Sequence, residues 1–191
     1  GTMERAIATI ELISVARGIL AADAMLKAAD VRLYEAHPIC PGKYLVVVGG
    51  QVGAVEESLR AGVRIGREAV SDHMILPNVH PDVFRALAMA TEPGNARAIG
   101  IVETMAAPCA IEGADAAAKA ANISLLEIRL GRGMGAKAFF SFVGDVSDVH
   151  AAAEAARRII EPKGLLVDIA EITGPHPDLP RREHRGHGHR R

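Results

Sequence analysis

The sequence predicts an α+β fold of two tandem units, each a ferredoxin-like sheet with the element order β-α-β-β-α-β. Three observations lead to this prediction. The chain repeats itself once along its length. Within each repeat, short apolar runs of strand length alternate with longer segments of helical periodicity. Hydrophobic residues make up 49% of the chain and aromatic residues only 3%, which indicates a core of Ala, Val, Ile and Leu.

The repeat aligns residues 6–31 with residues 98–123 without a gap. Identical residues in this stretch include Ala6, Ile7, Glu11, Ile19, Asp23, Ala24, Lys27, Ala28 and Ala29 in the first unit and Ala98, Ile99, Glu103, Ile111, Asp115, Ala116, Lys119, Ala120 and Ala121 in the second. The register then slips by two residues, so that Lys43 recurs as Lys137 and Gly50 as Gly144. Both units end on His-Pro-Asp, at residues 80–82 and 176–178.

The elements of each unit follow from the pattern of apolar residues. In the first unit we predict strands over residues 6–12, 31–37, 44–48 and 73–76, with helices over 15–29 and 51–69. In the second unit we predict strands over residues 98–104, 123–130, 137–143 and 164–172, with helices over 108–121 and 146–160. The first domain therefore spans residues 3–90 and includes a short linking helix over 81–89. Residues 91–97 form a linker, residues 98–178 the second domain, and residues 179–191 a tail.

The charge pattern separates the tail from the body of the chain. The net charge is −1, and five arginines against Glu183 give the tail +4, which leaves −5 for the preceding residues. A mildly acidic body gives no reason to expect nucleic-acid binding, and the basic, His-rich tail is predicted to be disordered. Two cysteines, no apolar run long enough for a membrane span and no signal-peptide pattern predict a soluble, cytoplasmic protein.

The loop Pro38-Ile39-Cys40-Pro41-Gly42-Lys43 joins two strand-like runs and is the most distinctive segment of the first unit. It places a thiol between two prolines, and no second cysteine stands at CxxC spacing. This thiol is either an inert loop residue or the chemically active group of the protein. In the second unit the same loop reads LGRGMGAK, so the two-residue slip falls at the loop tip, where functional divergence and neutral drift are both open.

Other polar motifs favour structural roles. The sequence Gly-Gly-Gln-Val-Gly at residues 49–53 lacks the dinucleotide-binding fingerprint and is typical of a tight turn between strand and helix. Glu11 and Glu103 stand at matching places in separate units, which favours structural hydrogen bonding over acid-base work. Cys109, early in a helix, is predicted to be a small buried hydrophobic residue. No nucleophile-base pair or chelating spacing appears within one chain, so we do not expect an enzyme.

Lys27 and Lys119 occupy equivalent positions, each four residues after the Asp of an Asp-Ala dipeptide and before two alanines. One interpretation is a solvated lysine that interacts with the carboxyl end of its helix dipole. Because the position is duplicated in two otherwise diverged units, an edge contact with a neighbouring molecule is the second interpretation.

Several of these motifs resemble the shell-protein domain of bacterial microcompartments. They are AIGIVET, the pair DAMLKAADV and DAAAKAANI, the Gly-Gly or Gly-Asp turn before the second helix, and the terminal His-Pro. Two fused copies make the chain similar to the tandem-domain, trimer-forming class, from residue 6 to about residue 177. The ICPGK loop resembles that of the tandem shell proteins of propanediol-utilisation compartments, in which the matching cysteine helps to hold an iron-sulfur cluster.

This resemblance implies a flat, pseudo-hexameric homotrimer that tiles with other microcompartment shell proteins and exchanges electrons with encapsulated or cytosolic redox proteins. Cys40 of each subunit would hold a shared [4Fe-4S] cluster on the central axis, with one iron left to a non-cysteine ligand. The resemblance places these residues in the pore loops: Pro38, Ile39, Pro41, Gly42, Gly131, Arg132, Gly133, Met134 and Gly135. We expect Lys43 and the amides of the second loop's glycines, Gly131 among them, to offset the cluster's negative charge.

Lys27 and Lys119 match the edge lysine of the same family, which packs against neighbouring tiles. Single-domain members often carry Arg-Pro-His where this chain has Asn-Val-His at 78–80 and Gly-Pro-His at 174–176, so the arginine of the lateral contact is missing. Two other functions remain open on the sequence. One is a pore tile that conducts metabolites without a cluster, and the other is a regulatory ferredoxin-like module that binds a small molecule between its units.

Overall fold

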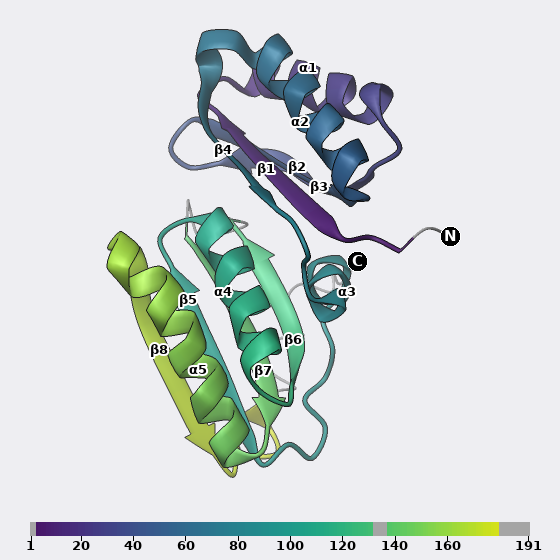
Figure 1. The fold of residues 1–191 in the computed structure, drawn as a ribbon. Helices are drawn as coiled ribbons and strands as arrows, with labels where there is room; N and C mark the ends of the chain where they lie inside the picture. The colour runs from purple at the N-terminus through teal and green to yellow at the C-terminus, as the bar shows by residue number, and fades with distance from the viewer. Residues whose placement is uncertain (1–2, 132–136, 180–191) are drawn as a thin grey trace, which may run out of the picture.

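The computed structural model describes residues 3–131 and 137–179, which form two units of the same architecture (Figure 1). The first unit contains β1 (Ala6–Leu12), α1 (Val15–Ala28), β2 (Arg32–Ile39), β3 (Lys43–Gly50), α2 (Val52–Gly66), the 3-10 helix η1 (Arg67–Ala69) and β4 (Val70–Leu76). Helix α3 (Pro81–Ala88) follows it. The second unit contains β5 (Ala98–Thr104), α4 (Ala107–Ala120), β6 (Ile123–Leu130), β7 (Ala138–Gly144), α5 (Val146–Ile160), the 3-10 helix η2 (Glu161–Lys163) and β8 (Leu166–Thr173).

The sheets have the strand orders β2-β3-β1-β4 and β6-β7-β5-β8, with every neighbouring pair antiparallel. This is the ferredoxin-like arrangement, so the predicted tandem α+β fold is confirmed. Even the irregularities repeat, because the register of β2 shifts between Leu33 and Glu35 and that of β6 shifts between the equivalent Leu125 and Glu127. The two helices of each unit lie side by side on one face of its sheet (Figure 1).

Several predicted boundaries in the first unit are wrong. The helix predicted over 51–69 ends at Gly66, where Arg67 takes a positive φ of 52° and the chain continues as η1. Strand β4 begins at Val70 rather than at residue 73, because pairing with β1 extends through polar residues that no apolar run announces. Strand β2 extends to Ile39 and β3 starts at Lys43, so the connecting loop is shorter than the sequence pattern indicated.

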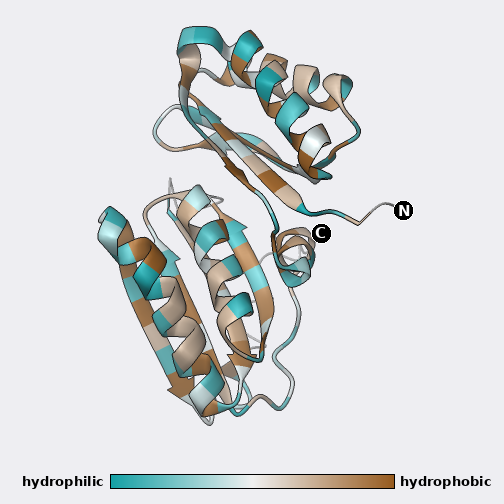
Figure 2. Cartoon of the chain, in the orientation of Figure 1, coloured by the Kyte–Doolittle hydropathy of each residue, from teal (hydrophilic) through white to brown (hydrophobic). Residues whose placement is uncertain are grey.

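The first sheet is covered on both faces, which explains why β1 is buried along its whole length. Ile10 and Val46 point toward α1 and α2 and pack with Met25. On the other face Ile7 and Val47 belong to one cluster with α3 and the core of the second unit. Hydrophobic colouring accordingly runs along the strands, whereas the helices mix hydrophobic and hydrophilic residues (Figure 2).

Helix α3 fastens the two units together. It contacts β6 and α4 of the second unit. The carboxylate of Asp82 accepts a hydrogen bond from the N–H of Leu125 at 2.7 Å, and the guanidinium of Arg85 donates to the Leu125 carbonyl. Because β6 is an edge strand, these two side chains satisfy backbone groups that would otherwise lack a partner strand. Just before α3, the N–H of His80 donates to the carboxylate of Asp115 on α4 at 2.8 Å.

Across residues 3–131 and 137–179, none of the helices has the length and apolar character that crossing a membrane requires.

Candidate functional site

The loop that carries Cys40 is the tip of the β2–β3 hairpin. Ile39 pairs with Lys43, so only Cys40, Pro41 and Gly42 lie beyond the last paired residues. Gly42 has a φ of 64°, a conformation that favours glycine because it has no Cβ. All three tip residues are exposed, and Cys40 is a free thiol. The sequence-predicted ligand therefore projects from the end of a hairpin, available to groups outside its own chain.

Two pairs of polar side chains lie at the base of this hairpin. Lys43 Nζ lies 3.9 Å from Glu11 Oε2, and the largely buried His37 and Glu35 are 2.9 Å apart. Burial raises the pKa of Glu11, whereas the charge of Lys43 lowers it. The positive charge that we expected to face a cluster is therefore shared with a carboxylate of the same chain.

The second unit repeats this pair, with Lys137 Nζ 4.0 Å from Glu103 Oε1. Each glutamate thus lies beside the lysine of its own unit.

The second hairpin differs from the first at its tip. Leu130 pairs with Ala138, and the N–H of Gly131 donates to the Lys137 carbonyl at 3.1 Å, which closes the hairpin. Five residues lie between Gly131 and Lys137, against three between Ile39 and Lys43, so the slip falls at the tip as predicted. Four predicted pore-loop residues lie outside the described residues: Arg132, Gly133, Met134 and Gly135. The expectation that the Gly131 amide offsets a ligand's charge is wrong, because this N–H is used within the hairpin.

The two cysteines have opposite environments. Cys109 is buried in α4, as predicted, and burial raises the pKa of its thiol, with Lys163 acting in the other direction. A buried, protonated thiol is a poor metal ligand. Among the described residues, no group of three or more His, Cys, Asp or Glu side chains lies close enough to hold a metal ion. Cys40 is therefore the single accessible thiol of the described residues, and these residues supply no further ligands for a cluster beside it.

The two predicted edge lysines each bind the aspartate one helical turn earlier. Lys27 Nζ lies 2.7 Å from Asp23, and Lys119 Nζ lies 2.8 Å from Asp115. Lys27 is the more exposed of the two, and its contact with a neighbouring tile stays a prediction. Sequence reasoning assigned no role to the aspartates, although their repeated spacing before each lysine was a usable signal.

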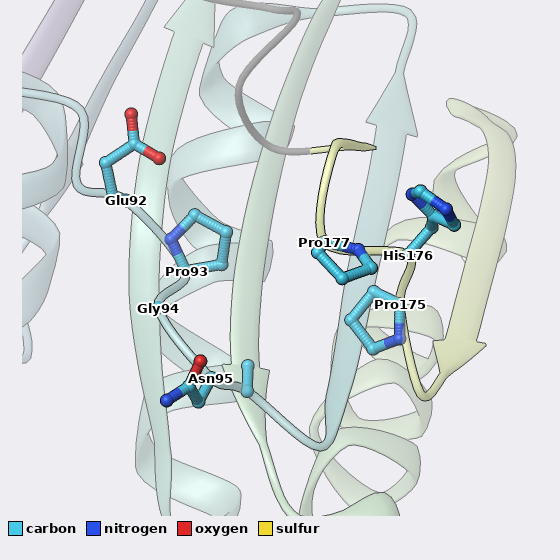
Figure 3. A pocket seen from close by; sticks show the side chains of 8 residues that line it. Glu92, Pro93, Gly94, Asn95, Pro175, His176 and Pro177 are labelled. Atoms are coloured by element: carbon cyan, nitrogen blue, oxygen red, sulfur yellow. The ribbon is translucent and has the colours of Figure 1, made fainter.

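A shallow pocket of about 670 Å³ lies between the linker and the chain after β8. Figure 3 shows Pro93 and Pro177 facing each other across it, with the imidazole of His176 turned away. The lining residues are Glu92, Pro93, Gly94, Asn95, Ala96, Pro175, His176 and Pro177. Small-molecule sites usually combine an enclosed apolar wall with converging polar groups, and this proline-lined depression offers neither.

Comparison with known proteins identifies a family model and relatives that match both units. The family model described as the BMC domain matches residues 6–79 and again residues 98–175. The bacterial microcompartment shell protein PduT of Citrobacter freundii is 40% identical over 177 residues, which cover 93% of this chain and 96% of that protein. The carboxysome assembly protein CcmO of Synechococcus elongatus is 33% identical over 83% of this chain and 61% of its own length.

A solved structure has the same fold throughout. The crystal structure of a microcompartment protein from Desulfitobacterium hafniense aligns with a TM-score of 0.89 at 46% identity, covering 94% of this chain and 99% of that one. The likeness therefore extends over both units and the connection between them.

Proposed function

This chain belongs to the BMC-domain family of bacterial microcompartment shell proteins, and from that premise we propose that it is a trimeric shell tile with a [4Fe-4S] cluster on its central axis. Cys40 of each subunit would hold the cluster, which would serve electron transfer or cluster delivery across the shell. The observation that carries this proposal is the exposed, unpaired thiol at the tip of a three-residue hairpin loop.

The donor chemistry of the loop fits an iron-sulfur cluster. Thiolates are the ligands that such clusters require, and a threefold axis supplies three of them from one residue per chain. The fourth iron would keep a non-cysteine ligand. Cys109 supports the assignment by contrast, because its thiol is buried whereas that of Cys40 is exposed. When bound, the cluster would supply one-electron redox chemistry.

The residues around Cys40 limit how the thiol is presented. The paired strands reach Ile39 and Lys43, so the tip has little freedom to fold back, and Gly42 accepts the left-handed turn. The three tip residues, Cys40, Pro41 and Gly42, include no acidic residue, lysine or arginine. A ligand at the tip would therefore meet Lys43 as the nearest cation along the chain, already beside Glu11.

The partners follow from the family. Other microcompartment shell proteins would pack around the trimer, with Lys27 and Lys119 at the edges, and redox proteins inside or outside the shell would exchange electrons with the cluster. The relatives named above are described as shell and assembly proteins, which supports tiling within a shell.

Anaerobic reconstitution tests the cluster directly. We expect iron and acid-labile sulfide at about one [4Fe-4S] cluster per three chains, a broad thiolate-to-iron absorbance band and an EPR signal after reduction. Cys40→Ser should lose most of the bound iron, and Cys109→Ser, the matched control, should retain it. Equal iron in the two variants, or none in the wild type, would reject the cluster.

A metabolite pore without a cluster is the second candidate, and the uncharged side chains of Pro41 and Gly42 favour it. In that case the trimer forms without iron, and Cys40→Ser changes the passage of small molecules through shells assembled from the purified protein rather than metal content.

A further inference from the structure

The hairpin that carries the proposed ligand lies at the same end of the first sheet as two helix ends. Leu12, the last residue of β1, pairs with Tyr44 near the start of β3 and with Val70 at the start of β4. Just after β1, the N–H of Ile13 donates to the carbonyl of Ala69 in η1 at 2.8 Å. The first turn of α1 and the last turn of α2 therefore lie beside the base of this hairpin (Figure 1).

Four arginines lie on or near these two helix ends. Arg60 and Arg64 are exposed, one helical turn apart, in the second half of α2, and Arg67 is exposed in η1. Arg17, in the first turn of α1, has its Nη1 3.5 Å from the carbonyl of Ile65, so its guanidinium lies against the last turn of α2. We call Arg17, Arg60, Arg64 and Arg67 the arginine patch.

Ion pairs do not neutralise the arginine patch. Among the described residues, no carboxylate forms an ion pair with any of these four arginines. Glu68 is the one carboxylate within residues 58–69, so four arginines against this glutamate leave a net charge of +3. The two glutamates at residues 56–57 lie about one helical turn further from the hairpin. Helix α2 therefore presents positive charge at the end where the hairpin projects.

The equivalent surface of the second unit is neutral. Glu154 and Glu161 stand where the first unit has Arg60 and Arg67, and each lies 3.3 Å from Arg157. A lysine of η2 is likewise paired with a glutamate of α4 at 2.5 Å. The cations on this surface are Arg157, Arg158 and Lys163, and the carboxylates are Glu112, Glu154 and Glu161. The positive charge without ion-pair partners therefore belongs to the unit that carries the exposed thiol.

Exposed apolar side chains lie beside the arginine patch. The exposed fractions are 60% for Ile13, 53% for Leu20 and 36% for Ile65. Met105 and Ile159, the equivalents of the first and last of these, are 47% and 40% exposed, so the contact between the two units leaves this surface free. Arginine is enriched in protein interfaces, where lysine is depleted, and its guanidinium can bind a carboxylate through two hydrogen bonds. Arginines around exposed apolar side chains are therefore typical of a surface that binds an acidic protein.

We infer that the arginine patch, with Ile13, Leu20 and Ile65, binds an acidic electron-transfer protein. Carboxylates of that protein pair with the arginines, and its redox group is thereby brought to the end of the sheet from which the Cys40 hairpin projects. The acidity of the partner follows from the arginine patch, whereas its redox character rests on the proposed function. A nucleic acid fits less well, because the chain before the tail has a net charge of −5 and the positive charge is confined to this patch.

Binding of a purified acidic flavodoxin, measured by isothermal titration calorimetry, tests the surface. We expect Arg60→Gln with Arg64→Gln to raise the Kd about tenfold, since both guanidinium groups lie within the contact. Arg97→Gln with Arg158→Gln is the matched control, because both arginines are exposed, belong to the second unit and change the net charge equally. The control should change the Kd by about twofold or less. No binding to the wild type, or an equal rise of Kd in the two double variants, would overturn the inference.

Salt and two further probes test whether the surface selects an acidic protein. The Kd for flavodoxin should rise as the ionic strength is raised from about 0.05 M to about 0.3 M, because salt screens exposed charges. A basic cytochrome c should not bind. A Kd for flavodoxin that is independent of salt, or equally tight binding of cytochrome c, would overturn the inference. Tighter binding of single-stranded DNA than of flavodoxin would also overturn it and would identify the arginine patch as a nucleic-acid site.

Repeating the titration with the Cys40→Ser variant separates this inference from the cluster. This variant lacks the proposed ligand but keeps the arginine patch, so flavodoxin should bind it with the Kd of the wild type. Flavodoxin binding together with an iron-free reconstituted wild type would reject the cluster and keep the docking surface. A reconstituted wild type that holds iron on Cys40 and does not bind flavodoxin would reject the docking surface and keep the cluster.

Discussion

The two units share one fold, but they place large and small side chains at different points of the same core. In the first unit, Gly18 of α1 lies directly over Tyr44 of β3, and a Cβ added at Gly18 would stand only 2.5 Å from the tyrosine Cβ. The equivalent positions in the second unit hold Ala110 and Ala138, both fully buried. One glycine and one tyrosine in the first unit thus occupy the places that two alanines occupy in the second.

The exchange also occurs in the opposite direction. In the second unit Gly100 is paired with Phe142, whose ring would lie 2.4 Å from an added Cβ, and the first unit has Ala8 and Val48 at these places. Two further contacts follow the pattern, with Gly62 and Met25 replaced by Ala156 and Ala117, and Ala21 and Gly66 replaced by Gly113 and Ile160. What recurs is that a large side chain stands opposite a glycine in one unit, where the other unit has small or medium-sized residues at both places, as close packing of the interior requires.

The largest expected effect comes from breaking one of these pairs. Gly18→Ala should destabilise the protein by about 3 kcal/mol, since the new methyl group meets the Cβ of Tyr44, which cannot move without the backbone. Tyr44→Ala alone should cost about 4 kcal/mol through the cavity it leaves. In the double variant, which has the alanine pair of the second unit, Gly18→Ala should become neutral or stabilise by up to about 1 kcal/mol through helix propensity.

Urea unfolding of the four proteins measures this coupling as a double-mutant cycle. If the two substitutions change the free energy of unfolding additively, the glycine at position 18 is not needed to accommodate Tyr44. Gly53→Ala is the control, because no atom lies within 4 Å of a Cβ added there, and its stability should be unchanged or slightly higher.

Much of this fold was predictable because the chain contains the same unit twice, so each copy can be compared with the other. The repeat placed the strands and helices of both units in the correct order, and apolar runs such as residues 44–48 marked the central strands. The compensated pairs were not predictable. The first of them joins residues of α1 and β3 whose contact depends on the approach of a helix to a sheet, and the sequence shows only two unrelated differences, at Gly18 and at Tyr44.

The candidate site was also predictable only in part. The prolines and glycine around Cys40 predicted an exposed turn, since these residues favour turns for local reasons. The length of the loop was overestimated, because pairing with β3 continues through Pro38 and Ile39, although proline cannot donate a backbone hydrogen bond. The role of Asp82 depends on β6 being an edge strand, and that of Asp115 depends on the approach of His80 to α4. Both are properties of the assembled fold that no local pattern reports.

The two equivalent aspartates give the next largest effect. Asp115→Ala should cost about 2 kcal/mol because it leaves the His80 N–H without its acceptor. Asp23→Ala should cost about 0.5 kcal/mol or less, since it removes only an exposed pair within one helix. Denaturant unfolding of the two variants measures the difference. Equal costs would mean that the contact between His80 and α4 does not distinguish the two units.

The smallest effect concerns the two glutamates at the bases of the hairpins. The Glu11 side chain is 12% exposed and that of Glu103 is 37% exposed, although both face an equivalent lysine. Burial raises the pKa of Glu11, Lys43 lowers it, and the charge of Asp72 adds to the rise. A raised pKa in the folded state means that the contribution of Glu11 to stability is fully present below the ordinary glutamate pKa and is lost as the pH rises through the folded value.

Glu11→Gln removes this titration, so the variant should gain stability relative to the wild type between about pH 4 and about pH 7. Urea midpoints at the two pH values measure the gain, and Glu103→Gln should show a smaller change because water already reaches its carboxylate. If Glu11→Gln instead loses stability relative to the wild type toward neutral pH, the attraction by Lys43 outweighs the effect of burial. The first hairpin would then hold a true ion pair beneath Cys40, and the two hairpin bases would be alike after all.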